Sequence, residues 1–467
     1  MRGSTIAAVL FAVIAAGFAL LAPVSDPDIF WHLASGDWML DHAQLLDRDV
    51  FSFTRTGVSY HTGEWLGEII LALAFRAGDW LALELLRAAC VGIGTFFAAR
   101  ATLRIQPHVG WAALPILGGI LVARTVWGDR PQLFTVALFP IVFDLLLGAR
   151  ISESPRRLAL LPPIFLLWAN LHAAFAAGLV LVAIFVIESG LARVRATRTP
   201  LLAALVVSVL ATFANPAGPG AIAAGFGYAS SSGAYVVEEG PLDVLTGAGI
   251  VVAAMLLGSL TIALVLGLEG ITTRLGAPLL WAGLIVPFGF LGFAIQRHAI
   301  LASVVLAPFV AAGLPAAIGR PARTAPLVPR SASAVILAGC VLLLGVAAAT
   351  VAPRSPNLAA YPEGALAALA ARPGHLLNEY DWGGFLVRNA PEHPVFVDGR
   401  GATLFLPDVL SDFDKAVGLG PGYRGVLDRW RIDLVLLRPE RPLAVALRED
   451  GWAVLGETAR WVLLARR

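Results

Sequence analysis

The stretch "IAAVLFAVIAAGFALLAPVSDPDIFWHLASGDWMLDH", residues 6–42, joins an apolar run to an acidic segment. The run at 6–22 is long enough to cross a membrane, for which about 17–25 residues are needed. Because Arg2 precedes it, the run is typical of a signal peptide or of an uncleaved signal anchor, and its length favours the anchor. The segment that follows holds four aspartates, two histidines and two tryptophans. So much acid beside a first membrane crossing indicates either an enzyme or a scaffold.

The composition of the whole chain is that of a membrane protein. Of its 467 residues, 58% are hydrophobic and 14% are charged, and the mean hydropathy is +0.78. Soluble proteins carry about 25% charged residues. The net charge of +2 argues against nucleic acid as a partner.

Apolar runs predict a mainly α fold, a polytopic transmembrane helix bundle of about 11 spans. The runs centre on residues 5–23, 79–102, 109–125, 131–148, 157–171, 173–192, 200–214, 247–268, 277–295, 298–318 and 332–352. The stretch "EWLGEIILALAFRA" at 64–77 predicts a shorter re-entrant or interfacial helix. We therefore expect a bundle over residues 1–354 that includes a first outer loop, 24–78, with interfacial helices.

Charge asymmetry between the loops predicts the orientation. With the N-terminus in the cytoplasm, the inner loops hold thirteen arginines against two acids, and the outer loops hold thirteen acids against six arginines. This distribution follows the positive-inside rule. An odd number of crossings then leaves residues 355–467 outside the cytoplasm.

Residues 355–467 have a different pattern. Apolar runs shorten to strand length at 394–398, 432–438, 452–457 and 460–466, and helix-like stretches lie near 358–371, 407–418 and 441–449. Alternating strands and helices predict a small extracytoplasmic α/β domain. Within it, Trp382 lies among acidic neighbours and is a candidate for stacking on a sugar ring. Turn chemistry explains the nearby Gly-Gly and Asp-Gly pairs equally well.

Two interpretations compete for "SDPD" at 25–28. In one, Asp26 is a helix N-cap, Pro27 takes the first helical position and Asp28 complements the helix dipole. In the other, a carboxylate here is a general base, or it binds a divalent cation that holds a phosphate. Both hold if Asp26 caps the helix while Asp28 and His32, on the polar face of an interfacial helix, look into a cavity among the membrane helices.

The outer loops contain further polar candidates. The first outer loop holds more acidic and histidine side chains than are needed to cap one helix. They include Asp47, Asp49, His61 and Glu64, although Glu64 also suits the start of a helix. Glu238 and Glu239 lie in a long outer loop that is either a mobile lid or a solvated acidic loop.

Basic and amide side chains gather at the predicted outer ends of the spans. They are Arg130 in "GDRPQ", Asn170 and His172 in "WANLH", and Arg297 and His298 in "QRH". Each alone suits a packing role, but their convergence on one side of the membrane predicts substrate contact. The guanidinium groups of Arg130 and Arg297 suit a phosphate.

Several motifs together resemble a bacterial family of polytopic membrane proteins described as glycosyltransferase-like. They are "DPDIFWHLASGDWML", "DVFSFTRTGVSYHTGEWLGE", "WANLHAAFAAG", "FANPAG" and "LNEYDWGGFLVRNAPEHPVFVDGRG". The resemblance covers most of the chain. More distantly, the architecture resembles the GT-C superfamily, which includes protein O-mannosyltransferases, aminoarabinose transferases and oligosaccharyltransferases.

The resemblance implies an activity and a location. In the GT-C superfamily the first outer loop carries an acidic residue beside an interfacial helix, and the donor is a polyprenyl-phosphate-linked sugar. By position, Asp28 matches the catalytic aspartate, and Asp26 is the next candidate. The implied protein is a cell-envelope glycosyltransferase of the bacterial cytoplasmic (inner) membrane, with a glycan, lipid or protein acceptor. His32 would tune Asp28 or help to bind a metal ion.

Two other classes of function stay open. A transporter or flippase for a lipid-linked glycan would be favoured by charged residues in mid-span, of which Glu84, Arg87, Asp144 and Glu188 are examples, but no internal repeat accompanies them. A non-catalytic assembly factor would use the outer domain to bind a partner. Grouping of Asp28, His172 and an arginine around one pocket favours the enzyme, and their dispersal favours the scaffold.

Overall fold

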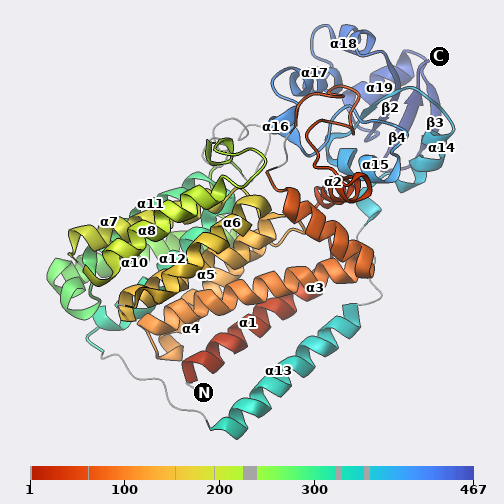
Figure 1. Cartoon of the computed structure of the whole chain (residues 1–467). Helices are drawn as coiled ribbons and strands as arrows, with labels where there is room; N and C mark the ends of the chain where they lie inside the picture. Colours follow the sequence, from red (N-terminus) through yellow and green to blue (C-terminus); the bar gives the residue numbers. More distant parts are fainter. Residues whose placement is uncertain are drawn as a thin grey trace. The chain divides into compact units, whose positions relative to one another are not determined.

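The computed structural model in Figure 1 describes residues 3–60, 63–152, 154–193, 195–223, 239–320, 329–351 and 358–467. These residues form two compact units. The helical unit comprises residues 3–22, 81–223, 239–320 and 329–351. The second unit, called the loop–sheet unit, comprises residues 23–60, 63–80 and 358–467.

The helical unit contains a helix at each of the eleven predicted spans. They are α1 (Gly3–Leu21), the second part of α3 (Trp65–Ile105), α4 (Val109–Ala123), α5 (Gln132–Ser152), α6 (Leu161–Leu171), α7 (Phe175–Leu191), α8 (Arg195–Thr212), α10 (Gly247–Arg274), α11 (Pro278–Ala294), α12 (Ala299–Ala317) and α13 (Arg330–Val351). Among the described helices, seven are long and apolar enough to cross a membrane. The prediction of a polytopic helix bundle is therefore confirmed.

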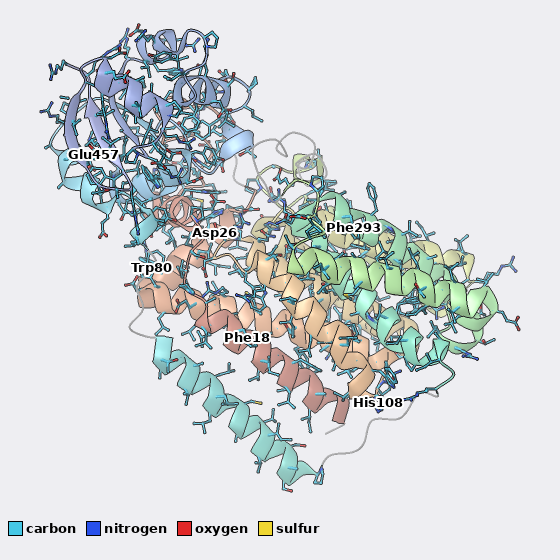
Figure 2. The ribbon with its side chains drawn as sticks, turned by 180° about the vertical axis from the view of Figure 1, so that it is seen from behind. Phe18, Asp26, Trp80, His108, Phe293 and Glu457 are labelled. Atoms are coloured by element: carbon cyan, nitrogen blue, oxygen red, sulfur yellow. The ribbon has the colours of Figure 1, made fainter. Side chains whose placement is uncertain are left out.

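Aromatic side chains fill the interior of the helical unit, and large apolar side chains on its outside would contact lipid. Phe139, Phe165 and Trp168 are each completely buried. Large apolar side chains are exposed on the outside, including Phe290 on α11 and Phe18 on α1, which Figure 2 labels. Because lipid chains are as apolar as these side chains, close packing and polar contacts hold the helices together.

The charged residues inside the helical unit form ion pairs. Arg87 on α3 donates to Asp129 over 2.6 Å, and both side chains are almost completely buried. Arg150 on α5 donates to Glu188 on α7 over 2.9 Å. Such pairs satisfy charges that would be costly to leave alone in a low dielectric.

The helix α3 breaks where the chain passes from one unit to the other. Gly78 and Asp79 leave the helical conformation, and Asp79 adopts a φ of 55°, in the left-handed region. The part of α3 before this break belongs to the loop–sheet unit and corresponds to the short helix predicted at 64–77. The part after it corresponds to the predicted span.

The loop–sheet unit is built on a four-stranded sheet in the order β1-β2-β4-β3. The strands are β1 (His375–Asn378), β2 (Ile432–Leu437), β3 (Ala453–Glu457) and β4 (Val462–Ala465). The first two are parallel, and the β2–β4 and β3–β4 pairs are antiparallel. The helices around the sheet are α2 (Ile29–His42), α14 (Leu366–Ala370), α15 (Gly383–Asn389), α16 (Gly401–Leu404), α17 (Asp408–Val417), α18 (Tyr423–Arg429) and α19 (Pro442–Glu449).

The first loop shares the core of the C-terminal residues. Ser52 forms a parallel bridge with Val395, which in turn bridges Leu376 of β1. Met39 and Tyr60 are buried in the same hydrophobic cluster as the sheet. Each buried side chain of this size contributes about 1.5–3 kcal/mol to stability. Residues 24–78 were expected to belong to the membrane-helix bundle, but the described ones before Leu81 pack with the sheet.

Three of the four predicted strands form, at 432–437, 453–457 and 462–465. The run at 394–398 is wrong as a strand because only Val395 forms bridges there. No strand was predicted at the position of β1. The predicted helices near 407–418 and 441–449 correspond to α17 and α19.

Candidate active site

The carboxylate of Asp28 stands at the start of α2 and is half-buried. Its Oδ1 accepts a hydrogen bond of 3.0 Å from the indole Nε1 of Trp31, one turn later on the same helix. Asp28 occupies the N-cap position of α2, but its side chain makes no capping hydrogen bond. Oδ1 of Asp26 accepts the backbone N–H of Asp28 over 3.0 Å; Figure 2 marks Asp26. The N-cap position predicted for Asp26 therefore belongs to Asp28, while Asp26 holds the turn that precedes the helix.

Glycines of the C-terminal residues make room for this helix start. A methyl group on Gly399 would overlap Oδ1 of Asp28 and would lie 2.8 Å from Nε1 of Trp31. A methyl group on Gly384 would lie 3.2 Å from the carbonyl oxygen of Pro27. The Gly-Gly and Asp-Gly pairs thus permit close approach of α2, which the turn interpretation had not anticipated.

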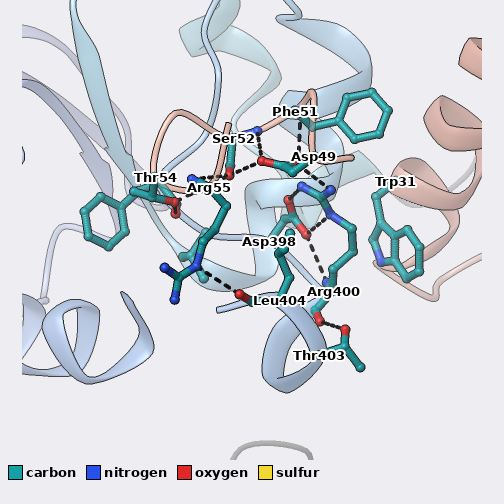
Figure 3. A network of polar contacts seen from close by, with 12 residues as sticks. Trp31, Asp49, Phe51, Ser52, Thr54, Arg55, Asp398, Arg400, Thr403 and Leu404 are labelled. Carbon is teal, nitrogen blue, oxygen red and sulfur yellow. Dashed lines mark hydrogen bonds and ion pairs between the residues drawn. The ribbon is translucent and has the colours of Figure 1, made fainter. Parts of the chain in front are cut away.

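A buried charge network fixes the turn that carries Gly399 (Figure 3). Arg400 is 0% exposed and donates to Asp398 through Nη2 over 2.6 Å and to Asp49 through Nη1 over 2.5 Å. The hydroxyl of Ser52 donates to the other oxygen of Asp49 over 2.5 Å. The two carboxylates raise the pKa of Arg400 although burial opposes this. These bonds join Asp49 of the first loop to Asp398 and Arg400, the two residues that flank Gly399.

Aromatic rings cover the same helix start. The ring of Phe30 meets those of Tyr361 and Phe385 edge to face, at centroid distances of 5.0 and 5.4 Å. Burial raises the pKa of the Tyr361 hydroxyl, and the nearby carboxylates of Asp26 and Asp28 raise it further. Tyr361 is therefore a protonated hydrogen-bond donor near both acids at neutral pH. Sequence reasoning missed Tyr361, because a single tyrosine carries no local signal.

The orientation predicted for His32 is wrong. His32 is 3% exposed, and its Nδ1 lies 3.2 Å from Oε1 of Glu68, which is completely buried. The reason is that α2 is packed on both faces: Gly36 touches Glu68 and Ala72 of α3, while Trp31 touches the glycines of the C-terminal residues. His32 therefore faces protein on the polar side of α2.

The helical unit gathers four of the predicted basic residues. Arg130, Arg297 and His298 lie within electrostatic range of His172. Nδ1 of His172 faces two donors, the backbone N–H of Ala174 at 3.2 Å and the Thr135 hydroxyl at 2.9 Å.

Trp168 donates its indole N–H to this same Thr135 hydroxyl over 2.9 Å, so the hydroxyl hydrogen is available for His172. The proton of a neutral His172 is then carried on Nε2. Arg297 also forms an ion pair with Glu239, whereas Glu238 lies outside the described residues.

Two asparagine side chains, Asn170 and Asn215, donate hydrogen bonds to backbone carbonyl oxygens at the ends of α6 and α8. Asn170 donates to the carbonyl oxygens of Leu166 and Ala214 over 2.8 and 3.0 Å. Asn215 donates to the carbonyl oxygen of Ala169 over 2.8 Å. These bonds join the ends of α6 and α8, so Asn170 has a packing role.

The remaining candidates lie in the loop–sheet unit or outside the described residues. Glu64 immediately precedes α3, at the helix-start position, and His61 lies outside the described residues. Trp382 is 2% exposed and donates its indole N–H to the carbonyl oxygen of Ala360 over 3.0 Å. It lines a cleft of about 500 Å³, and the guanidinium of Arg438 lies over its ring at 5.5 Å, which leaves little of the ring for a sugar.

Few side chains of the described residues are placed to bind a metal ion together. Among the described residues, no three histidine, cysteine, aspartate or glutamate side chains converge as a metal site requires. Asp26 and Asp28 are only two carboxylates, and each accepts one hydrogen bond from the protein, whereas Ca²⁺ takes about six to eight oxygen ligands.

The chain thus combines a helix bundle, a first loop with acid at the start of a helix, and a C-terminal α/β sheet. No protein-family model matches the sequence, and no curated protein matches it. Among solved structures, the fold is similar to the oligosaccharyltransferase of Archaeoglobus fulgidus, crystallised with a tethered acceptor peptide that contains the NVT sequon. The match has a TM-score of 0.53 at 11% identity and covers 92% of this chain and 69% of that one.

A second solved structure, ArnT from Cupriavidus metallidurans in the apo state, matches at a TM-score of 0.48 and 16% identity. The match covers 98% of this chain and 97% of that one. The predicted resemblance to GT-C proteins is confirmed at the level of the fold. The chain is a multi-pass membrane protein with that fold.

Proposed function

We propose that this protein is an integral-membrane glycosyltransferase that moves a sugar from a polyprenyl-phosphate-linked donor to an extracytoplasmic acceptor, with Asp28 as the general base. The observation that carries the proposal is the carboxylate of Asp28, which is half-buried and oriented by Trp31 at the start of α2, in a chain with a GT-C fold. A carboxylate needed only for capping would accept backbone N–H groups of the first helical turn, and the Asp28 side chain makes no such capping bond.

The proposed reaction is a single displacement. Asp28 removes the proton of an acceptor hydroxyl as its oxygen attacks the anomeric carbon. The bond from the anomeric carbon to the donor phosphate breaks, the polyprenyl phosphate leaves with the bonding electrons, and the anomeric configuration inverts. Arg130 or Arg297 would stabilise the departing phosphate, and His172 and His298 lie in the same basic group.

Against a transporter, three of the four charges named in mid-span form ion pairs with other side chains of the bundle. Arg87 is paired with Asp129, Asp144 with Arg104, and Glu188 with Arg150. Charges that line a transport path usually face water or move between partners. Pairs between neighbouring helices are the pattern expected of structural contacts.

The test replaces the chromosomal copy by Asp28→Asn and measures the cell-envelope glycans and lipid-linked sugars by mass spectrometry. We expect one glycan to lose a sugar while a polyprenyl-phosphate sugar accumulates. Removing a general base costs about 10²–10⁴-fold in rate, so the loss should be nearly complete. The purified variant should remain folded in detergent.

Asp41→Asn is the matched control, because Asp41 lies on the same helix, is exposed and only pairs with Arg76. It should leave the glycans unchanged. An Asp28→Asn strain with wild-type glycans and wild-type levels of protein would contradict the proposal and favour an assembly factor.

A further inference from the structure

A cluster of arginines lies around one buried carboxylate in the helical unit, among residues that the proposed reaction does not use. Asp144 on α5 is completely buried. Its Oδ1 accepts Nε of Arg104 over 2.8 Å, and its Oδ2 accepts Nε of Arg100 over 3.1 Å. Both arginines belong to the last turns of α3, and about a third of each side chain is exposed. Both oxygens of Asp144 are therefore occupied.

A third guanidinium joins this cluster. Arg157 lies in the short helix η2 (Pro155–Leu160) and is exposed. A methyl group on Gly148 would lie 3.0 Å from Nη1 of Arg157 and 3.7 Å from Nη1 of Arg104. The two guanidinium groups therefore share the space left open by one glycine. Within the described part of the chain, no acid forms an ion pair with Arg157.

Among the described residues, the charges of this cluster do not balance. Two guanidinium groups contact the one carboxylate and a third lies beside them, and no second described acid forms an ion pair with any of the three arginines. Like charges held together beside a low-dielectric bundle repel one another unless an anion joins them. Planar guanidinium forks bind phosphate oxygens in pairs. Arg100 is also held in place by the ring of Phe97, at 4.5 Å.

We propose that Arg100, Arg104 and Arg157 form a binding site for a phosphate group, supplied by an anionic lipid headgroup or by free phosphate. The site goes beyond the proposed transferase activity and uses none of its residues. It lies among arginines assigned to the cytoplasmic side by the charge asymmetry of the sequence, where basic clusters between helices meet anionic headgroups. Because Gly148 has no side chain, the guanidinium groups of Arg157 and Arg104 both lie against its backbone, close enough together to bind one phosphate group.

The test uses the full chain purified in detergent. In one arm, native mass spectrometry measures binding of phosphatidylglycerol against phosphatidylcholine. In the other arm, inorganic phosphate is titrated and the thermal unfolding midpoint is recorded. We expect Arg157→Gln to weaken binding about 5- to 10-fold, as loss of one charge-assisted contact does, and Arg157→Lys to recover part of it.

Arg274→Gln is the matched control, because Arg274 is an exposed arginine at the end of α10 whose guanidinium contacts the carbonyl oxygen of Ala316. It should bind as the wild type does. If Arg157→Gln weakens the binding of phosphatidylglycerol but not of inorganic phosphate, the ligand is a lipid headgroup. If it weakens the binding of inorganic phosphate as well, the ligand is a free phosphate anion. Equal binding by wild type and Arg157→Gln in both arms would overturn the proposal. Because transfer activity is not measured, failure here leaves the proposed function untouched.

Discussion

At the scale of single residues, Gly399 decides how closely the C-terminal residues approach Asp28. Alanine is compatible with its backbone, so the only obstacle to Gly399→Ala is the overlap of the new methyl group with the Asp28 carboxylate and the Trp31 ring. We expect the substitution to displace the carboxylate and reduce sugar transfer by at least about 10-fold, since small misplacements of catalytic groups can cost about 10²-fold. Transfer rates of the purified proteins measure the effect.

Gly425 provides the comparison for this experiment. It lies in α18, and nothing lies within 4 Å of the position that its side chain would occupy. Gly425→Ala should therefore keep the wild-type rate. If Gly399→Ala also keeps it, while circular dichroism shows the same fold, then Asp28 is not held by this contact.

Arg400 is a second single residue on which the fold depends, because its charge is paired with two buried carboxylates. Replacing it by methionine leaves Asp49 and Asp398 buried without their cation, and breaking a buried pair in this way costs about 3–5 kcal/mol. Arg400→Lys keeps the charge but cannot serve both carboxylates with a planar fork, so its loss should be smaller. Thermal unfolding of the full chain measures both variants. The exposed pair of Arg424 with Asp450 supplies the control Arg424→Met, for which little loss is expected.

At the scale of elements, the first loop shows where sequence reasoning ends. The start of α2, the short helix before Gly78 and the strands β2, β3 and β4 follow from apolar periodicity and from capping residues, which are local signals. The bridge from Ser52 to Val395 joins segments more than 300 residues apart, and no periodicity records it. The one available hint is chemical: "DVFSF" and "PVFVDGRG" combine strand-like residues with complementary charges.

An ion pair at the edge of this contact makes the pairing testable by pH. Arg55 of the first loop donates to Asp408 at the start of α17 and holds the pKa of Asp408 below its usual range. Because the folded pKa is the lower one, the pair stabilises the fold above the unfolded pKa, about 3.9. That stabilisation disappears as the pH falls through the folded pKa.

Asp408 is 57% exposed, so screening limits the effect to about 0.2–1 kcal/mol. We expect Asp408→Asn to lower the free energy of unfolding by that amount at pH 7 and to have no effect well below pH 3.9. Unfolding of wild type, Asp408→Asn, Arg55→Gln and the double variant at both pH values measures the coupling. A coupling that is independent of pH would show that the contact is not ionic.

At the scale of the whole molecule, the bundle was predictable because each span is a long apolar run. The grouping of Arg130, His172, Arg297 and His298 within the helical unit was predictable because costly polar residues recur at the same ends of the spans. The burial of His32 was not predictable from the sequence. Helical periodicity predicts which residues of α2 share a face, but it does not predict how many other elements pack on that face.

The orientation predicted from the loop charges is tested by reporter fusions. Alkaline phosphatase, which is active only outside the cytoplasm, should be active when fused after residue 467 and inactive when fused after residue 320, between α12 and α13. An odd number of crossings requires the two ends of the chain to lie on opposite sides. The helix α6 has 11 residues, about 17 Å at 1.5 Å per residue, and is short for a bilayer core of about 30 Å.

If α6 and α7 together formed a re-entrant hairpin, the number of crossings would fall by two and its parity would be unchanged. The expected result for the fusion after residue 467 therefore holds under either count, and it follows from the arginine-rich inner loops. Activity after residue 320 together with inactivity after residue 467 would invert the orientation. In that case Asp28 would lie on the cytoplasmic side, and an extracytoplasmic acceptor would be excluded.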